Sequence, residues 1–196
     1  SDGVKSPCPQ GRYGSSIKET SSSCSGACAL GFRCDAGTVT PVACPASQPF
    51  SYCKNGQQFS VDPGYYSTSQ NVDGISVSVG QVITPSGYWA AGGVKRACSA
   101  GFFNPNEGQT LCTTECPAGF YCPAASSTPL KCGAVNVFCP RGSGQPLAVS
   151  TGFYSVPTSA PVDERTGEQQ CPPGKWCSGG VSASCPGGTY GADAGA

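Results

Sequence analysis

The cysteines are the residues whose type and spacing could do chemistry in this chain. There are 15 of them among 196 residues, and no histidine accompanies them. Thiols in such number bind a metal or form disulfides, but the paired two-residue spacings of all-cysteine zinc sites are missing. Secreted chains with small cores use disulfides as covalent links. We therefore predict disulfides, no metal, no cofactor and an extracellular or cell-surface location.

The rest of the composition argues against catalysis and against charged partners. Without histidine, the chain lacks the Ser-His-Asp and Cys-His nucleophile systems. Eleven basic and eleven acidic side chains give no net charge, so no basic surface is expected for nucleic acid. No apolar run is long enough to span a bilayer. We expect no enzymatic activity, no nucleic-acid partner and no membrane insertion in this segment.

The cysteine spacing repeats along the chain. Gaps of 3, 5 and 9 residues recur in the same order after Cys24 and after Cys112, and the repeat period is 90 and then 87 residues. The segment 87–98 also aligns with 174–185 without a gap. We expect an excerpt of a longer tandem array, divided into the tail of one repeat at 1–7, a repeat at 8–97 with a hairpin interval at 54–97, a repeat at 98–184 with a hairpin interval at 140–170, and the start of a third repeat at 185–196.

Two cysteines occur in the second repeat alone. Cys171 and Cys177 occupy the positions of Thr84 and Ala90 in the first repeat. Because both are absent together from the first repeat, we predict that they form a disulfide. Cys185 begins a new repeat, so we expect it to be unpaired within the chain. For the six cysteines of each repeat, many connectivities remain open at this point.

Tight turns must position these cysteines. A glycine followed within two residues by an aromatic side chain recurs along the chain, four times per repeat, as in Cys116-Pro-Ala-Gly-Phe-Tyr-Cys122. Proline presets the first corner of such a turn and glycine accepts a positive φ. Each unit is expected to bury one or two rings and little else.

The cysteine-poor intervals are expected to form β-hairpins. In the first, an Asp-Gly turn leads into alternating apolar residues at Ile75, Val77 and Val79. In the second, a hairpin with a more polar return strand is expected from Gly152 to Gly167. No helical periodicity is present. The predicted fold is small, disulfide-rich and mostly irregular with short β-hairpins, as an elongated tandem-repeat rod with almost no helix.

The C-P-x-G-x-aromatic-C unit with its C-x3-C-x5-C spacing resembles the ephrin-receptor-like cysteine-rich repeats, which are similar in style to tumour-necrosis-factor-receptor modules. Similar arrays occur in receptor ectodomains and in protist or algal surface proteins, including flagellar-hair (mastigoneme) components. The resemblance implies pairing of the first cysteine with the second, the third with the fifth and the fourth with the sixth. The implied bridges are Cys8–Cys24, Cys28–Cys44, Cys34–Cys53, Cys98–Cys112, Cys116–Cys132 and Cys122–Cys139.

Other candidate sites have ordinary explanations. Asp163 and Glu164, followed by Arg165, could be part of a glycosidase pair or a calcium site, but no oxygen-rich loop accompanies them, and a solvated hairpin turn is the favoured interpretation. Trp89 and Trp176 could stack on sugars. Their recurrence at one position of the repeat favours packing on a disulfide or a neighbouring unit.

Serine and threonine with proline are typical of O-glycosylated segments. Thr40-Pro41 and Thr128-Pro129 occupy equivalent positions, and no Asn-x-Ser/Thr sequon occurs. An ordinary loop role for these residues remains open. The O-glycan candidates are Thr40, Thr128, Thr84, Thr158, Ser159, Ser126 and Ser127.

The sequence favours a structural role over a catalytic one. We expect a disulfide-linked, O-glycosylated repeat rod in a surface filament, flagellar hair or matrix. Its partners would be copies of itself or neighbouring repeats, which would associate through the exposed strand edge at Ile75, Val77 and Val79. The alternative is the ligand-binding or adhesion ectodomain of a cell-surface receptor.

Overall fold

A computed structural model describes residues 5–16 and 21–192. The predicted repeat boundaries at 1–7 and 185–196 therefore lie partly outside the described residues. By contacts between Cα atoms, the chain divides into unit 1 (Ser1–Thr84, Ala90–Arg96 and Gly108–Thr110) and unit 2 (Pro85–Trp89, Ala97–Glu107 and Leu111–Ala196). These units do not coincide with the sequence repeats.

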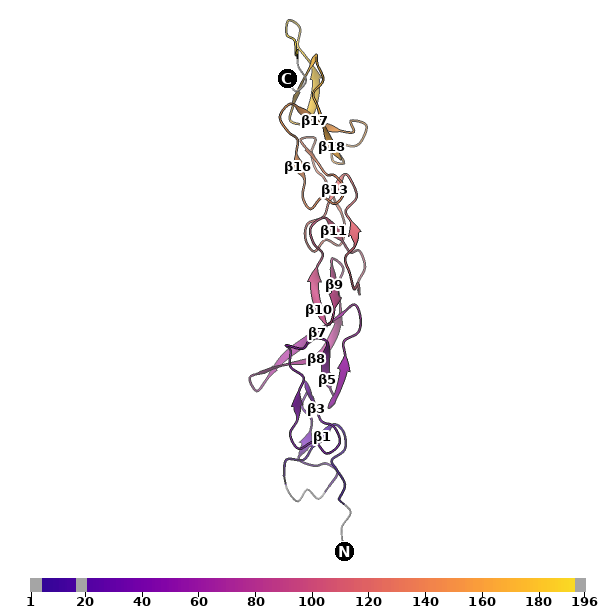
Figure 1. The fold of residues 1–196 in the computed structure, drawn as a ribbon, viewed down its shortest axis with the longest axis vertical. Coiled ribbons are helices and arrows are strands. Elements are labelled where there is room, and N and C mark those ends of the chain that lie inside the picture. The colour runs from indigo at the N-terminus through magenta and orange to yellow at the C-terminus, as the bar shows by residue number, and fades with distance from the viewer. Residues whose placement is uncertain (1–4, 17–20, 193–196) are drawn as a thin grey trace. The chain divides into compact units, whose positions relative to one another are not determined.

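The described residues contain no helix, and their strands form two-stranded sheets made of consecutive strands (Figure 1). The small, disulfide-rich, hairpin-rich fold expected from the sequence is therefore confirmed. The segment 8–97 contains β1 (Arg12–Tyr13), β2 (Gly26–Ala27), β3 (Phe32–Arg33), β4 (Val42–Ala43), β5 (Ser51–Lys54), β6 (Gln57–Ser60), β7 (Tyr65–Val72), β8 (Ile75–Ile83), β9 (Tyr88–Ala91) and β10 (Val94–Ala97). The segment 98–184 contains β11 (Phe102–Phe103), β12 (Thr114–Glu115), β13 (Phe120–Tyr121), β14 (Leu130–Lys131), β15 (Val137–Phe138), β16 (Leu147–Ala148), β17 (Phe153–Val156), β18 (Gly167–Gln170), β19 (Lys175–Ser178) and β20 (Val181–Ser184).

A turn precedes the first strand of each hairpin, and a glycine in most of these turns links the hairpin to its neighbours. At Gly119, whose φ is 84°, the turn closes with a bond from the amide of Phe120 to the carbonyl of Pro117 at 3.2 Å. The Gly119 carbonyl accepts from the amide of Cys132 at 3.1 Å, and its own amide donates to the carbonyl of Cys139 at 2.8 Å. These bonds tie the turn to its own return strand and to the next hairpin in the chain.

The four glycine–aromatic units of each repeat all lie at turns, and each repeat contains one further turn that lacks the glycine. The amide of Ser51 bonds the carbonyl of Gln48, and the amide of Val137 bonds the carbonyl of Ala134. Phe50 and Asn136 take the place of glycine, and neither has a positive φ. Because the turn does not need the left-handed region at these positions, the glycine signal is absent and each repeat holds five hairpins.

The bridge predicted from the repeat alignment is present, and of the three bridges per repeat that the resemblance implied, the first is present and the other two are not. Pairs that agree with the expectation are Cys8–Cys24, Cys98–Cys112 and Cys171–Cys177, with Cys185 free. The implied Cys28–Cys44, Cys34–Cys53, Cys116–Cys132 and Cys122–Cys139 bridges are wrong. The structure instead has Cys28–Cys34, Cys44–Cys53, Cys116–Cys122 and Cys132–Cys139.

The turn geometry explains this correction. Cys28 precedes a turn and Cys34 follows the first strand after it, so the chain folds back and brings their Cα atoms to 6.0 Å. Cys116–Cys122 and Cys171–Cys177 span the same sequence separation of 6, with Cα atoms 5.8 and 5.7 Å apart. Each inner bridge therefore closes one turn locally.

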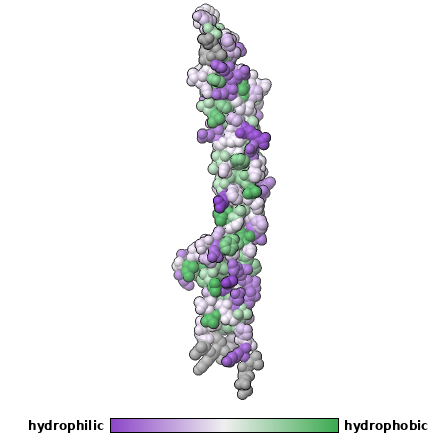
Figure 2. All heavy atoms as spheres, viewed as in Figure 1, coloured by the Kyte–Doolittle hydropathy of each residue, from purple (hydrophilic) through white to green (hydrophobic). Residues whose placement is uncertain are grey.

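The disulfides also make most of the core. Of the buried hydrophobic residues that the structure describes, only Val77 and Ala90 are not half-cystines. Figure 2 shows apolar and polar residues intermingled on the visible face rather than gathered into one apolar surface. Local covalent closure, rather than a large apolar core, is what holds each turn.

The two predicted interval hairpins are present. Strands β7 and β8 meet at a two-residue turn in which Asp73 and Gly74 have φ of 49° and 82°, as a type I′ turn requires. The tip of this hairpin projects from the rest of unit 1 (Figure 1). Strands β17 and β18 form the second hairpin, and β18 is polar, with the sequence Gly-Glu-Gln-Gln.

Candidate binding pocket in unit 2

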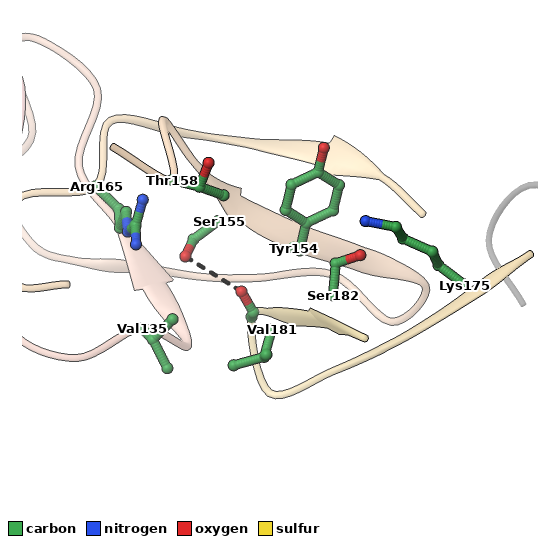
Figure 3. Close-up of a pocket in the computed structure, with 9 residues that line it drawn as sticks. Val135, Tyr154, Ser155, Thr158, Arg165, Lys175, Val181 and Ser182 are labelled. Atoms are coloured by element: carbon green, nitrogen blue, oxygen red, sulfur yellow. Dashed lines mark hydrogen bonds between the residues drawn. The ribbon is translucent and has the colours of Figure 1, made fainter. Parts of the chain in front are cut away.

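A pocket of about 270 Å³ lies beside the β17–β18 hairpin in unit 2. Figure 3 shows Arg165 and Lys175 at opposite ends of it, with Tyr154 and Ser155 of β17 and Ser182 of β20 between them. The remaining lining comes from Val135, Thr158, Gly180 and Val181. Two cations and several hydroxyl groups therefore share one small cavity with a tyrosine ring.

Backbone pairing fixes Ser155 in the lining of the pocket. The amide of Ser155 donates to the carbonyl of Gly180 at 2.9 Å, and its hydroxyl lies 3.3 Å from the same oxygen. Gly180 itself must be glycine, because an added Cβ would lie 1.9 Å from the carbonyl oxygen of Val135. The close approach of these backbones brings β17, β20 and the segment before β15 together around the cavity.

Arg165 is the most unusual residue of the pocket. It lies in the loop between β17 and β18 and is only 6% exposed. Its NH1 group donates to the carbonyl of Pro157, and its own carbonyl accepts from the amide of Cys139 at 2.9 Å. Its Nε is buried without a hydrogen-bond partner, and none of the ion pairs among the described residues includes it. The guanidinium charge is therefore buried and uncompensated by the protein.

The acidic neighbours of Arg165 pair with a different cation. Lys131 Nζ lies 2.9 Å from Asp163 Oδ2 and 3.0 Å from Glu164 Oε1. The hydrogen bond from Lys131 lowers the pKa of Asp163, and the bonds to the two carboxylates raise the pKa of Lys131. Both acids are half-exposed in a loop, consistent with the predicted solvated turn. They do not neutralise Arg165.

The predicted glycan candidates differ in accessibility. Thr84 is fully buried at 0% exposure, so its prediction as a glycan site was wrong, because an enzyme could not reach its hydroxyl. The exposed candidates are Thr40, Thr128, Thr158 and Ser159, and Ser126 and Ser127 are half-buried. Ser126 also donates its hydroxyl to the carbonyl of Pro123 at 2.6 Å.

The predicted self-association edge is occupied in part by the protein itself. Val77 is 0% exposed and Val79 is half-buried, and only Ile75 of the three is exposed. The amide of Ser78 donates to the carbonyl of Cys44, and the carbonyl of Ser76 accepts from the amide of Ala46. This stretch of β8 therefore cannot pair with another chain without losing those bonds.

A second hollow, of about 410 Å³, lies in unit 1. Its walls include Tyr13 and Phe32 together with Ile75 from the projecting hairpin, and Thr40 and Pro41 stand in its lining. Of the two tryptophans, Trp89 is half-buried, whereas Trp176 is exposed. Both tryptophans belong to unit 2.

Sequence reasoning gave Arg165 no role beyond a solvated turn. Its burial depends on contacts between the 157–166 loop and Cys139, which no local pattern shows. The available sequence signal was the position of Arg165. It follows the acidic pair Asp163 and Glu164 in an interval whose sequence differs between the two repeats.

The chain has no recognisable relative among known families and curated proteins. No protein-family model matches the chain, and no curated protein sequence matches it significantly. Residues 5–16 and 21–192 include no helix long and apolar enough to cross a membrane. Within the same residues, no cluster of three or more histidine, cysteine or acidic side chains is placed to hold a metal ion.

Proposed function

We propose that this protein is an extracellular structural protein whose tandem hairpins form part of a surface filament, flagellar hair or matrix. Seven disulfides among the described residues are typical of an extracellular chain. The observation that carries the proposal is the backbone bond from a turn glycine to the next hairpin. The bond recurs from Gly11 to Cys34, from Gly31 to Cys53, from Gly101 to Cys122 and from Gly119 to Cys139.

Each of these four bonds makes one hairpin a support for the next one. Repeats that contact only their neighbours can extend without limit on size, because stability is a sum of local terms. The inner disulfides span only 6 to 9 residues. Covalent closure at this scale suits a structural array, and an elongated rod is the form we propose for it.

Electron microscopy of the native, non-reduced protein tests the proposal. Regular fibres that break up on reduction, together with large species in light scattering, are the expected result. A protein that stays monomeric at all concentrations and forms no fibres would contradict it and favour the receptor ectodomain.

We also propose O-linked glycans at Thr40 and Thr128. Both side chains are exposed, and Thr40 stands in the hollow lined by Tyr13 and Phe32, where a sugar could pack on the rings. Thr40→Val and Thr128→Val should each lower the intact mass by one glycan. Thr84→Val is the matched control, because the buried residue cannot be modified, and its mass should change only by the substitution. An unmodified native mass would refute the proposal.

A further inference from the structure

The buried charge of Arg165 has no protein partner to balance it. A buried ion costs several kcal/mol unless it is paired and hydrogen-bonded. One NH1 bond to a neutral carbonyl leaves the positive charge uncompensated and Nε unsatisfied. Because native proteins satisfy nearly all buried polar groups, each exception needs an explanation. An anion in the pocket would supply both the missing charge and the missing acceptor.

The other end of the pocket is also prepared for an anionic ligand. Lys175 is exposed at that end, and the hydroxyl of Ser182 is buried without a partner. The hydroxyl of Tyr154 donates to Gln169 Oε1 at 2.9 Å, which holds the ring in place along the cavity. Two cations separated by hydroxyl groups and an aromatic ring suit a ligand that is charged and also rich in hydroxyls.

The first repeat provides a natural comparison. There the amide and hydroxyl of Ser67 approach the carbonyl of Gly93, as those of Ser155 approach Gly180. However, Lys95, which aligns with Ser182, lies 4.8 Å above the ring of Tyr66. The first repeat thus places a lysine over its tyrosine and has no counterpart of the loop that carries Arg165. The hairpin fold does not itself require the buried arginine.

We propose that this pocket binds an acidic sugar residue, with its carboxylate or sulfate group on Arg165 and its hydroxyls on Ser155, Ser182 and the Lys175 ammonium. A planar guanidinium binds carboxylate and sulfate oxygens in pairs. The volume of about 270 Å³ is near the lower end for small-molecule sites, which suits a single sugar residue. The Tyr154 ring offers an apolar face for the sugar C–H groups.

The test is a titration of the non-reduced protein with glucuronate, glucose and inorganic sulfate, followed by amide NMR. Glucuronate should shift the signals of Ser155 and Ser182, and raising the ionic strength should weaken the effect. Arg165→Gln should lower the affinity by about tenfold or more, and Lys175→Gln by about threefold. Lys95→Gln is the matched control in the first repeat and should leave the affinity unchanged.

Three outcomes would overturn the proposal. Glucose binding as tightly as glucuronate would show that charge is not recognised, and inorganic sulfate binding as tightly would show that the sugar is not. No shift at any concentration would remove the site. If Arg165→Gln does not fold, Lys175→Gln, which alters an exposed side chain, still decides the question.

Discussion

The position of the Cys171–Cys177 bridge can be recreated in the first repeat. Thr84 and Ala90 align with these cysteines, and both are fully buried. The amide of Thr84 bonds the carbonyl of Gly64 at 3.0 Å, as the amide of Cys171 bonds the carbonyl of Gly152 at 2.8 Å. The backbone at the start of both segments is therefore held alike, and we expect Thr84→Cys with Ala90→Cys to form a disulfide.

The expected stabilisation follows from the size of the loop. The Cys171–Cys177 bridge spans a separation of 6 residues, with Cα atoms 5.7 Å apart. In the chain-entropy description, closing so short a loop in the unfolded state contributes about 2 kcal/mol. The substitution also removes the Thr84 hydroxyl, which is buried without a partner, so no hydrogen bond is lost.

The assay is urea unfolding combined with thiol counting, in a Cys185→Ser background that prevents exchange with the free cysteine. The double cysteine variant should show no free thiol. Its free energy of unfolding should be about 2 kcal/mol higher than that of the background protein. Thr84→Ser with Ala90→Ser, which matches the side-chain size without the bond, should show no such gain. Two free thiols in the folded double variant would refute the equivalence of the two positions.

Two further predictions concern a backbone contact and an ion pair. Gly180→Ala should destabilise the fold by about 1–3 kcal/mol more than Gly179→Ala in urea unfolding, because both glycines have positive φ but only Gly180 faces the Val135 carbonyl. Because Lys131 lowers the pKa of Asp163, the stabilisation is present above the ordinary value of 3.8 and lost as pH falls through the lowered pKa. Unfolding midpoints at pH 5 and below pH 3 should therefore differ more for the native protein than for Asp163→Asn.

The local features of this fold could be read from the sequence. The Asp-Gly turn and the alternation after it predict the β7–β8 hairpin, because a two-residue turn and a period of two are local properties. The first repeat has no cysteine at either of the two positions that Cys171 and Cys177 occupy in the second, and this joint absence identified their bridge. The same separation recurs at Cys28–Cys34 and Cys116–Cys122, so a comparison with that pair would have found these two bridges as well.

The tertiary structure decided what depends on segments meeting across the chain. Composition places Thr84 among glycan candidates, but packing buries it. The sequence predicts that the edge of β8 is free to pair with another chain, but the backbone groups of Cys44 and Ala46 form hydrogen bonds with it. Arg165 lies in a polar loop, yet contacts with Cys139 and Pro157 bury its charge. The spacing of residues specifies which of them can form a turn. The burial of a residue depends on which distant segment covers that residue, and this is decided only in the folded chain.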